Sequence, residues 1–105
     1  MSPSMVKITI VKVFEPKDVI GRDFIKSDGN PIPKCFLEEG QEFLVTDDGE
    51  MPEGFCQQAW HSIHTSVSLL RYGGHVPNWT GEDTLYSACP DGLRPVCFKV
   101  ERVKE

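Results

Sequence analysis

The sequence lacks any long apolar run and any excess of positive charge. No stretch of its 105 residues approaches the roughly 20 apolar residues of a membrane-spanning helix, and its first four residues do not resemble the start of a secretory signal. Acidic residues outnumber basic ones by 16 to 11, so the net charge is −5. Such a chain has no basic surface to hold a phosphate backbone. We therefore predict a cytoplasmic protein whose partners include neither nucleic acid nor a membrane.

The sequence also lacks the common cofactor and hydrolase motifs. It contains no G-x-G-x-x-G, no G-x-x-x-x-G-K-[ST], no H-E-x-x-H and no G-x-S-x-G. Its four cysteines (Cys35, Cys56, Cys89 and Cys97) include no C-x-x-C pair. In a cytoplasmic protein, such cysteines are expected to be thiols rather than disulfides. These absences predict a protein without an organic cofactor.

The length and composition fit one domain. A chain of 105 residues leaves no room for a second domain, and 39% hydrophobic residues are enough for a small core. No repeat, linker or low-complexity segment divides the chain. We therefore predict a single domain over residues 1–105, with its core between about residues 5 and 103.

Four segments have the pattern of β-strands. Apolar Val6, Ile8 and Ile10 alternate with polar Lys7 and Thr9 in a strand over residues 5–14. The apolar positions then shift by one residue, which predicts a bulge. Further strands are predicted over residues 41–46, 84–89 and 95–103. Residues 15–33 are rich in Pro, Gly and Asp, which predicts a long loop with a short helical turn near residues 18–25.

One segment has the pattern of an amphipathic helix, ended by Gly73 and Gly74. Its apolar residues fall within an arc of roughly 100°. They are Cys56, Ala59, Trp60, Ile63, Val67 and Leu70. The element order β-loop-β-α-β-β predicts an α+β fold, in which a small antiparallel sheet or a partial barrel packs against this helix.

Cys56 is a candidate catalytic residue because of its place in the predicted helix. It falls in the first turn, where unpaired backbone N–H groups and the positive end of the helix dipole stabilise an anion. It also belongs to the apolar stripe, where a cysteine packs as a small hydrophobic residue. Both interpretations remain open from the sequence: a reactive or ligating thiol, or a core side chain.

One edge of the predicted helix combines an aromatic ring, a fixed cation and two histidines. Trp60, His64 and Arg71 lie close together on the helical wheel, and His61 lies one turn from His64. This mixture suits the wall of a pocket, with His64 as an acid or base and Trp60, His61 and Arg71 as substrate-binding groups. The alternative is a partly exposed edge whose polar tips reach water.

Two loops carry further candidates. Asp91 and Arg94 flank Gly92 and Leu93 in a tight turn, where they either orient a polar ligand or pair with each other and with the turn amides. We assign Asp91 a catalytic role and Arg94 a substrate-binding role. The connector 75–81 carries Trp79, which is predicted to supply an apolar wall.

The cysteines allow a metal site as an alternative. Cys35, Cys56 and Cys89, with one of the three histidines, would suit Zn²⁺ or an iron centre if folding brought them together. Cys97 falls on the polar face of the last predicted strand and is treated as incidental.

Three motifs resemble those of a family of small, uncharacterised microbial single-domain proteins. They are P-x-G-x-C-x-x-A-W at residues 52–60, L-x-x-G-G at 70–74 and C-x-D-G-x-x-P-V-x-F at 89–98. The resemblance spans about residues 5–103. It implies that Cys35, Cys56 and Cys89, but not Cys97, face a common site with Trp60 and the Asp91 turn.

These observations lead to three hypotheses about function. The leading one is a cofactor-independent enzyme that acts on a small organic molecule by acid–base chemistry, of the isomerase, cyclase or lyase type, with secondary metabolism as one setting. The second is a zinc- or iron-binding protein. The third is a non-catalytic accessory or interaction protein, with a homodimer formed through a sheet edge or the Trp79 loop.

Overall fold

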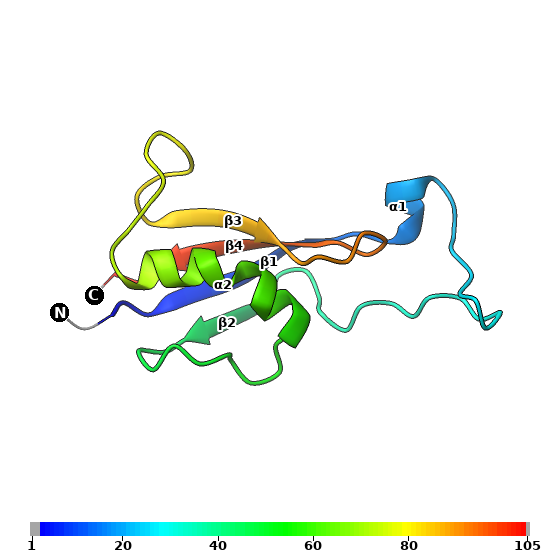
Figure 1. Ribbon diagram of the computed structural model, residues 1–105, viewed down its shortest axis with the longest axis horizontal. Helices are drawn as coiled ribbons and strands as arrows, with labels where there is room; N and C mark the ends of the chain where they lie inside the picture. Colours follow the sequence, from blue (N-terminus) through cyan, green and yellow to red (C-terminus); the bar gives the residue numbers. More distant parts are fainter. Residues whose placement is uncertain (1–2, 105) are drawn as a thin grey trace.

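Four strands form one open antiparallel sheet in the computed structural model, which describes residues 3–104 (Figure 1). The strands are β1 (Val6–Val13), β2 (Glu42–Val45), β3 (Thr84–Ala88) and β4 (Val96–Arg102), and their spatial order is β2-β1-β4-β3. The central strands are therefore β1 and β4, and the edges are β2 and β3. The fold is α+β, as predicted, and the sheet is open rather than curled into a partial barrel.

The alternation along β1 places its apolar residues on one face of the sheet. Val6, Ile8 and Ile10 are buried, whereas Lys7 lies on the opposite, open face. The predicted bulge is confirmed, because the pairing of β1 with β4 shifts between Ile10 and Lys12.

The long helix α2 (Gln57–Arg71) covers the apolar face of the sheet (Figure 1). Ala59, Ile63, Val67 and Leu70 recur at helical spacing and are almost fully buried. They form one core with residues of all four strands, which are Val6, Ile8, Ile10, Val45, Leu85, Val96, Phe98 and Val100. No helix within residues 3–104 is long and apolar enough to span a membrane.

The two ends of α2 are defined by different residues. Cys56 has extended backbone angles (φ −83°, ψ 125°) and is the N-cap residue, so its predicted place in the first turn is wrong by one position. Its carbonyl accepts a hydrogen bond from the Trp60 amide at 2.9 Å. At the other end, Gly73 takes the predicted left-handed conformation (φ 83°), which a residue with a side chain rarely adopts.

Arg102 links β4 to the C-terminal end of α2 through hydrogen bonds. Its side chain is only 13% exposed and donates to the carbonyl of Leu70 at 2.8 Å and to the carbonyl of Gly74. The same guanidinium pairs with Asp83 at 2.6 Å. The last carbonyls of a helix have no partner within the helix and carry partial negative charge. A largely shielded cation therefore satisfies this helix end.

Between β1 and β2 the chain leaves the sheet as an arm, residues 14–36, which contains the loop predicted at 15–33 (Figure 1). The predicted helical turn lies at α1 (Pro16–Ile20) rather than near residues 18–25, because Pro16 favours the first turn and Gly21 (φ 78°) ends it. No residue of the arm is buried. The radius of gyration is 15.3 Å, compared with about 13 Å for a compact domain of this length.

Replacing Arg102 with Met is expected to lower the free energy of unfolding by about 2–4 kcal/mol, because the helix-end carbonyls and Asp83 lose a buried donor. Lys104 also pairs with Asp83, at 2.8 Å, but its side chain is 72% exposed. The control Lys104→Met is therefore expected to leave stability nearly unchanged. Urea unfolding followed by circular dichroism measures both variants, and equal losses would contradict this role of Arg102.

Candidate functional site

A pocket of about 280 Å³ opens at the N-terminal end of α2. Its walls come from three segments: the end of the arm, the start of α2 and the turn between β3 and β4. We call it the thiol pocket, and its lining residues are Pro33, Lys34, Cys35, Phe36, Leu37, Cys56, Gln58, Ala59, Cys89, Pro90, Asp91, Arg94 and Val96.

Three cysteines, one from each segment, line this pocket. Cys35, Cys56 and Cys89 are all half-buried free thiols. The shared site implied by the motif pattern is therefore found for these three residues. Cys97 lies apart on the open face of the sheet, opposite Lys12 on β1 and Ala88 on β3.

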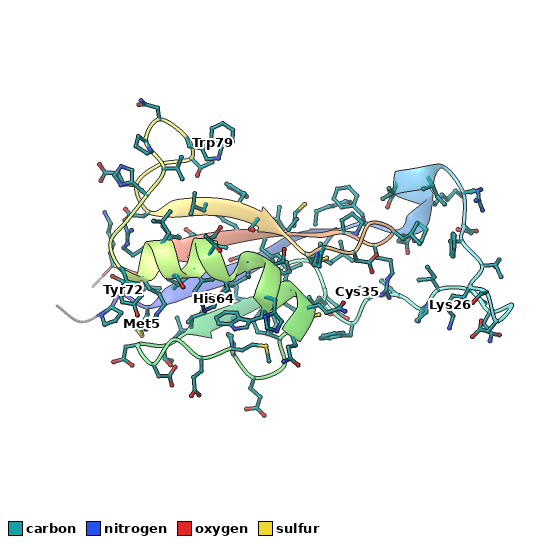
Figure 2. The ribbon with its side chains drawn as sticks, in the orientation of Figure 1. Met5, Lys26, Cys35, His64, Tyr72 and Trp79 are labelled. Atoms are coloured by element: carbon teal, nitrogen blue, oxygen red, sulfur yellow. The ribbon has the colours of Figure 1, made fainter. Side chains whose placement is uncertain are left out.

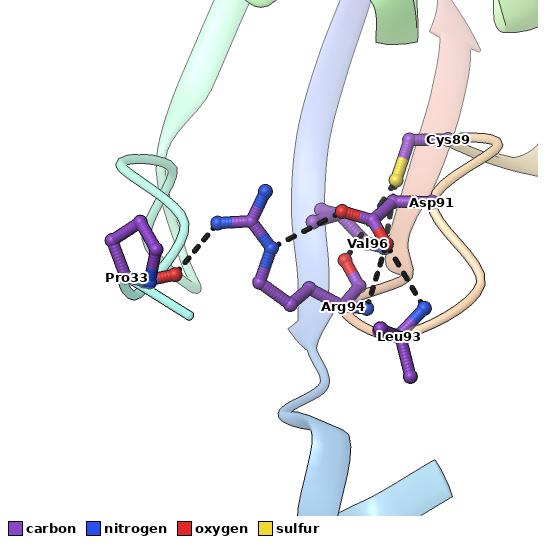
Figure 3. Close-up of polar contacts among 6 residues, drawn as sticks. All are labelled: Pro33, Cys89, Asp91, Leu93, Arg94 and Val96. Carbon is purple, nitrogen blue, oxygen red and sulfur yellow. Dashed lines mark hydrogen bonds and ion pairs between the residues drawn. The ribbon is translucent and has the colours of Figure 1, made fainter. Parts of the chain in front are cut away.

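The three thiols differ in how strongly the backbone holds them. The Cys89 sulfur accepts a hydrogen bond from the Val96 amide at 3.2 Å and lies 3.9 Å from the Arg94 carbonyl oxygen (Figure 3). In contrast, the Cys56 side chain makes no capping hydrogen bond to α2. Cys56 is thus the pocket thiol at the helix end, and its half-buried side chain packs against the edge of the core.

Asp91 and Arg94 form a fixed pair at the side of the pocket (Figure 3). One Asp91 oxygen accepts the amides of Leu93 and Arg94 at 2.9 and 3.1 Å, and the other accepts Arg94 Nε at 3.1 Å. Arg94 Nη1 then donates to the Pro33 carbonyl at 2.6 Å. The pair therefore joins the β3–β4 turn to the end of the arm and holds two walls of the pocket together.

The environment of Asp91 favours its ionised form. Partial burial acts to raise the pKa of Asp91, but the hydrogen bonds from the Leu93 and Arg94 amides and from the Arg94 guanidinium outweigh it. The pKa of Asp91 consequently lies below its ordinary value. A carboxylate with both oxygens occupied is suited to positioning Arg94 rather than to the catalytic proton transfer predicted for it.

The residues predicted to form a pocket along the helix edge do not line the thiol pocket. Trp60 packs edge-on against Phe55, with ring centroids 6.3 Å apart, and against His64 at 5.3 Å. His64 is exposed and lies 3.5 Å from the Ser68 hydroxyl, and His61 is exposed as well. Figure 2 shows His64 on the flank of α2, away from Cys35. Trp60 thus contributes to the aromatic packing around Phe55.

Arg71 has a structural role at the other end of α2. It is 9% exposed, and its Nη2 donates to the Asp47 carbonyl at 2.7 Å. Gly49 (φ 74°) packs so closely that a Cβ atom there would lie 2.3 Å from Arg71 Nη1. The guanidinium therefore fixes the turn after β2 and does not reach the thiol pocket, contrary to the predicted substrate-binding role.

Trp79 lies on the loop that projects from the edge of the sheet, far from Cys35 (Figure 2). Its side chain is 73% exposed, so it supplies no wall to the thiol pocket. Its neighbour Asn78 takes a left-handed conformation (φ 58°), which Asn tolerates better than most residues.

The zinc or iron alternative lacks a ligand set in the described part of the chain. Among residues 3–104, no group of three or more His, Cys, Asp or Glu side chains is arranged to hold a metal ion. Cys35, Cys56 and Cys89 share a pocket but come from different walls, and the Cys89 sulfur already bonds to backbone. This arrangement differs from a closed thiolate site, in which all ligands converge on one point.

Comparisons with known protein families, with curated proteins and with solved structures gave no match. The family resemblance therefore stays a prediction from the motifs, and the site is interpreted from its own geometry.

Several pocket residues were not predicted from the sequence. Phe36 and Leu37 follow Cys35 directly, and this apolar triplet was the available signal for them. Gln58 falls on the side of the helical wheel opposite the apolar stripe, yet it lines the pocket because the arm and the turn extend past the start of α2. Contacts with such irregular segments leave no periodic pattern in the sequence.

Replacing Asp91 with Asn is expected to cost about 1–2 kcal/mol of stability at pH 7, since the charged pair with Arg94 is lost. A carboxylate whose pKa is lowered by folding stabilises the native state above its unfolded pKa of about 3.9 and loses this effect as the pH falls through the folded value. The difference between wild type and variant should thus shrink below about pH 4. Urea unfolding at pH 7 and pH 3 tests this, and a difference independent of pH would contradict it.

Proposed function

We propose that the protein is a cofactor-independent enzyme that binds a small organic molecule in the thiol pocket and transforms it by acid–base chemistry, as an isomerase, cyclase or lyase does. The observation that carries the proposal is the meeting of three thiols from separate segments in one largely apolar pocket. The free thiols also support the cytoplasm as the place of action.

The size and walls of the pocket favour a small substrate. A volume of about 280 Å³ lies at the lower end of the range for ligand sites. Leu37, Ala59 and Val96 offer apolar contact, whereas Gln58 of α2 and Arg94 of the β3–β4 turn supply hydrogen-bond donors. Such a site fits a compact molecule with one polar or anionic end.

Cys56 is the proposed acid–base group. Its thiolate would take a proton from a carbon next to a carbonyl, and the electron pair of the broken C–H bond would move to the carbonyl oxygen as an enolate. In a substrate with a C=C bond β,γ to the carbonyl, the thiol would return the proton to the γ-carbon while the C=O bond re-forms and the C=C bond moves to the α,β position, so the substrate is isomerised without net oxidation or reduction. Cys56 is favoured over Cys89 because the Cys89 sulfur is bonded to the Val96 amide.

Arg94 is the proposed partner for the enolate or for a substrate carboxylate. Its Nε and Nη1 are committed to Asp91 and to the Pro33 carbonyl, which fixes the plane of the guanidinium (Figure 3). Its Nη2 makes no hydrogen bond to any residue between 3 and 104. A cation held in place before the reaction stabilises developing negative charge without having to reorganise. Asp91 acts on the reaction through Arg94 and is a positioning residue.

The test replaces Cys56 with Ser and measures proton exchange. Wild-type protein is expected to exchange carbon-bound protons of small ketones and keto acids with D₂O, as followed by proton NMR. Cys56→Ser should slow this exchange by about 100-fold or more, because a general base is lost. Two controls should keep the wild-type rate: Cys97→Ser on the open face of the sheet, and His64→Ala on the flank of α2.

Three results would oppose the proposal. Exchange at the wild-type rate in Cys56→Ser would remove Cys56 as the base, and a large loss in His64→Ala would restore the helix edge as the active site. Wild-type protein that exchanges no member of the panel above the buffer rate would remove this class of reaction.

A non-catalytic interaction protein is the second candidate, because Trp79 is 73% exposed on a projecting loop. Exposed tryptophans of this kind are common anchors in protein interfaces. This candidate predicts that all thiol-pocket variants behave like wild type in the exchange experiment.

A further inference from the structure

The arm, residues 14–36, presents several apolar side chains that are about half exposed. Val19, Ile20 and Ile25 are between 41% and 55% exposed. Isolated exposed apolar residues are ordinary, but several on one projecting segment mark an interaction surface. This surface does not include the helix edge or the Trp79 loop.

The arm keeps a defined shape without burial. Its tip is a narrow hairpin, in which the Lys26 amide donates to the Asn30 carbonyl at 2.8 Å and Ile25 bridges to Pro31. At its base, Arg94 holds the Pro33 carbonyl. Figure 2 shows Lys26 at the far end of the molecule from α2. The arm is thus preorganised, which lowers the entropic cost of binding.

The surface area of the chain indicates how much of it a partner would cover. The accessible surface is 6819 Å², compared with about 5,900 Å² for a compact monomer of this mass. The excess of about 900 Å² is close to the roughly 800 Å² that each partner contributes to a standard stable interface. The projecting arm therefore gives the chain enough additional surface for one interface of ordinary size.

The charge of the arm favours a second copy of this chain as that partner. The arm holds four basic and four acidic residues, so the whole net charge of −5 belongs to the rest of the chain. The basic residues are Lys17, Arg22, Lys26 and Lys34, and the acidic residues are Glu15, Asp18, Asp23 and Asp28. A neutral surface of mixed charge can pair with its own copy, and contact through the arms keeps the two acidic bodies far apart.

The two edge strands of the sheet are less suited than the arm to pairing with a second copy. The outer carbonyls of β3 at Thr84 and Ala88 already accept the hydroxyls of Thr80 and Ser62. Hydrogen bonds of this kind occupy backbone groups that another strand would need for pairing. The opposite edge, β2, is only four residues long and begins with a charged Glu42.

We propose that two copies of this chain form a homodimer through the arm, each arm packing on the arm of its partner and covering Ile20 and Ile25. The contact is isologous, so both copies use the same surface. The contact uses α1 and the hairpin tip, which do not line the thiol pocket, and it does not depend on the chemistry of that pocket.

Sedimentation velocity of the full chain over a range of micromolar concentrations tests the interface. Wild type is expected to sediment as a dimer, and Ile25→Glu should weaken dimerisation by about 100-fold or more, because it places an uncompensated charge in the contact. The matched control is Leu44→Glu on β2. Leu44 is 46% exposed and Ile25 is 55% exposed, and both variants add one negative charge to the chain. Leu44→Glu should dimerise like wild type.

A second measurement checks the geometry of the dimer. X-ray scattering of the wild type should give a maximum dimension well above the 53 Å length of one chain, because the bodies lie at opposite ends. A wild-type protein that remains monomeric at the highest concentration would overturn the proposal. So would a Leu44→Glu variant that loses dimerisation as strongly as Ile25→Glu, or a compact dimer in the scattering data.

Discussion

The packing of α2 on the apolar face of the sheet is the constraint on which the rest of the structure depends. The apolar stripe of the helix meets the buried faces of β3, β4 and β1, and the core residues of this contact are almost free of solvent. Burial of this kind is the main favourable term in folding a small domain. Because α2 is fixed in direction and rotation by this contact, its N-terminal end is held beside the end of the arm and the β3–β4 turn. The position of Cys56 in the pocket is therefore a consequence of core packing.

The spacing of apolar residues was sufficient to predict the regular strands and the long helix. The period-two pattern through Ile8 and the helical spacing from Ala59 to Leu70 each predict one buried face, and the same faces are buried in the structure. The prediction failed for Arg71 because an arginine at the edge of an apolar stripe usually extends its tip into water. Here the turn around Gly49 closes over the guanidinium. That contact depends on a loop whose path has no periodic signal.

The candidate site was only partly predictable for the same reason. The motif pattern grouped Cys35, Cys56 and Cys89 correctly in one place, since each lies next to a turn or a helix end that the sequence marks. The motif pattern also grouped Trp60 with them, and the helical wheel placed it beside His64 and Arg71, but its ring packs against Phe55. A helical wheel gives the direction in which a side chain leaves the helix. It does not show which neighbouring segment that side chain meets.

Several of the hydrogen bonds and ion pairs that link separate segments of the fold lie at the two ends of α2. Arg71 and Arg102 hold the C-terminal end to the turn after β2 and to β4, whereas the Asp91–Arg94 pair holds the walls at the N-terminal end. The Asp91 and Arg94 side chains are 32% and 29% exposed, whereas Arg102 is 13% and Arg71 9% exposed, so the two ends differ in their resistance to local opening. The thiol pocket can therefore open by separation of the arm from the β3–β4 turn, while the helix and sheet remain packed.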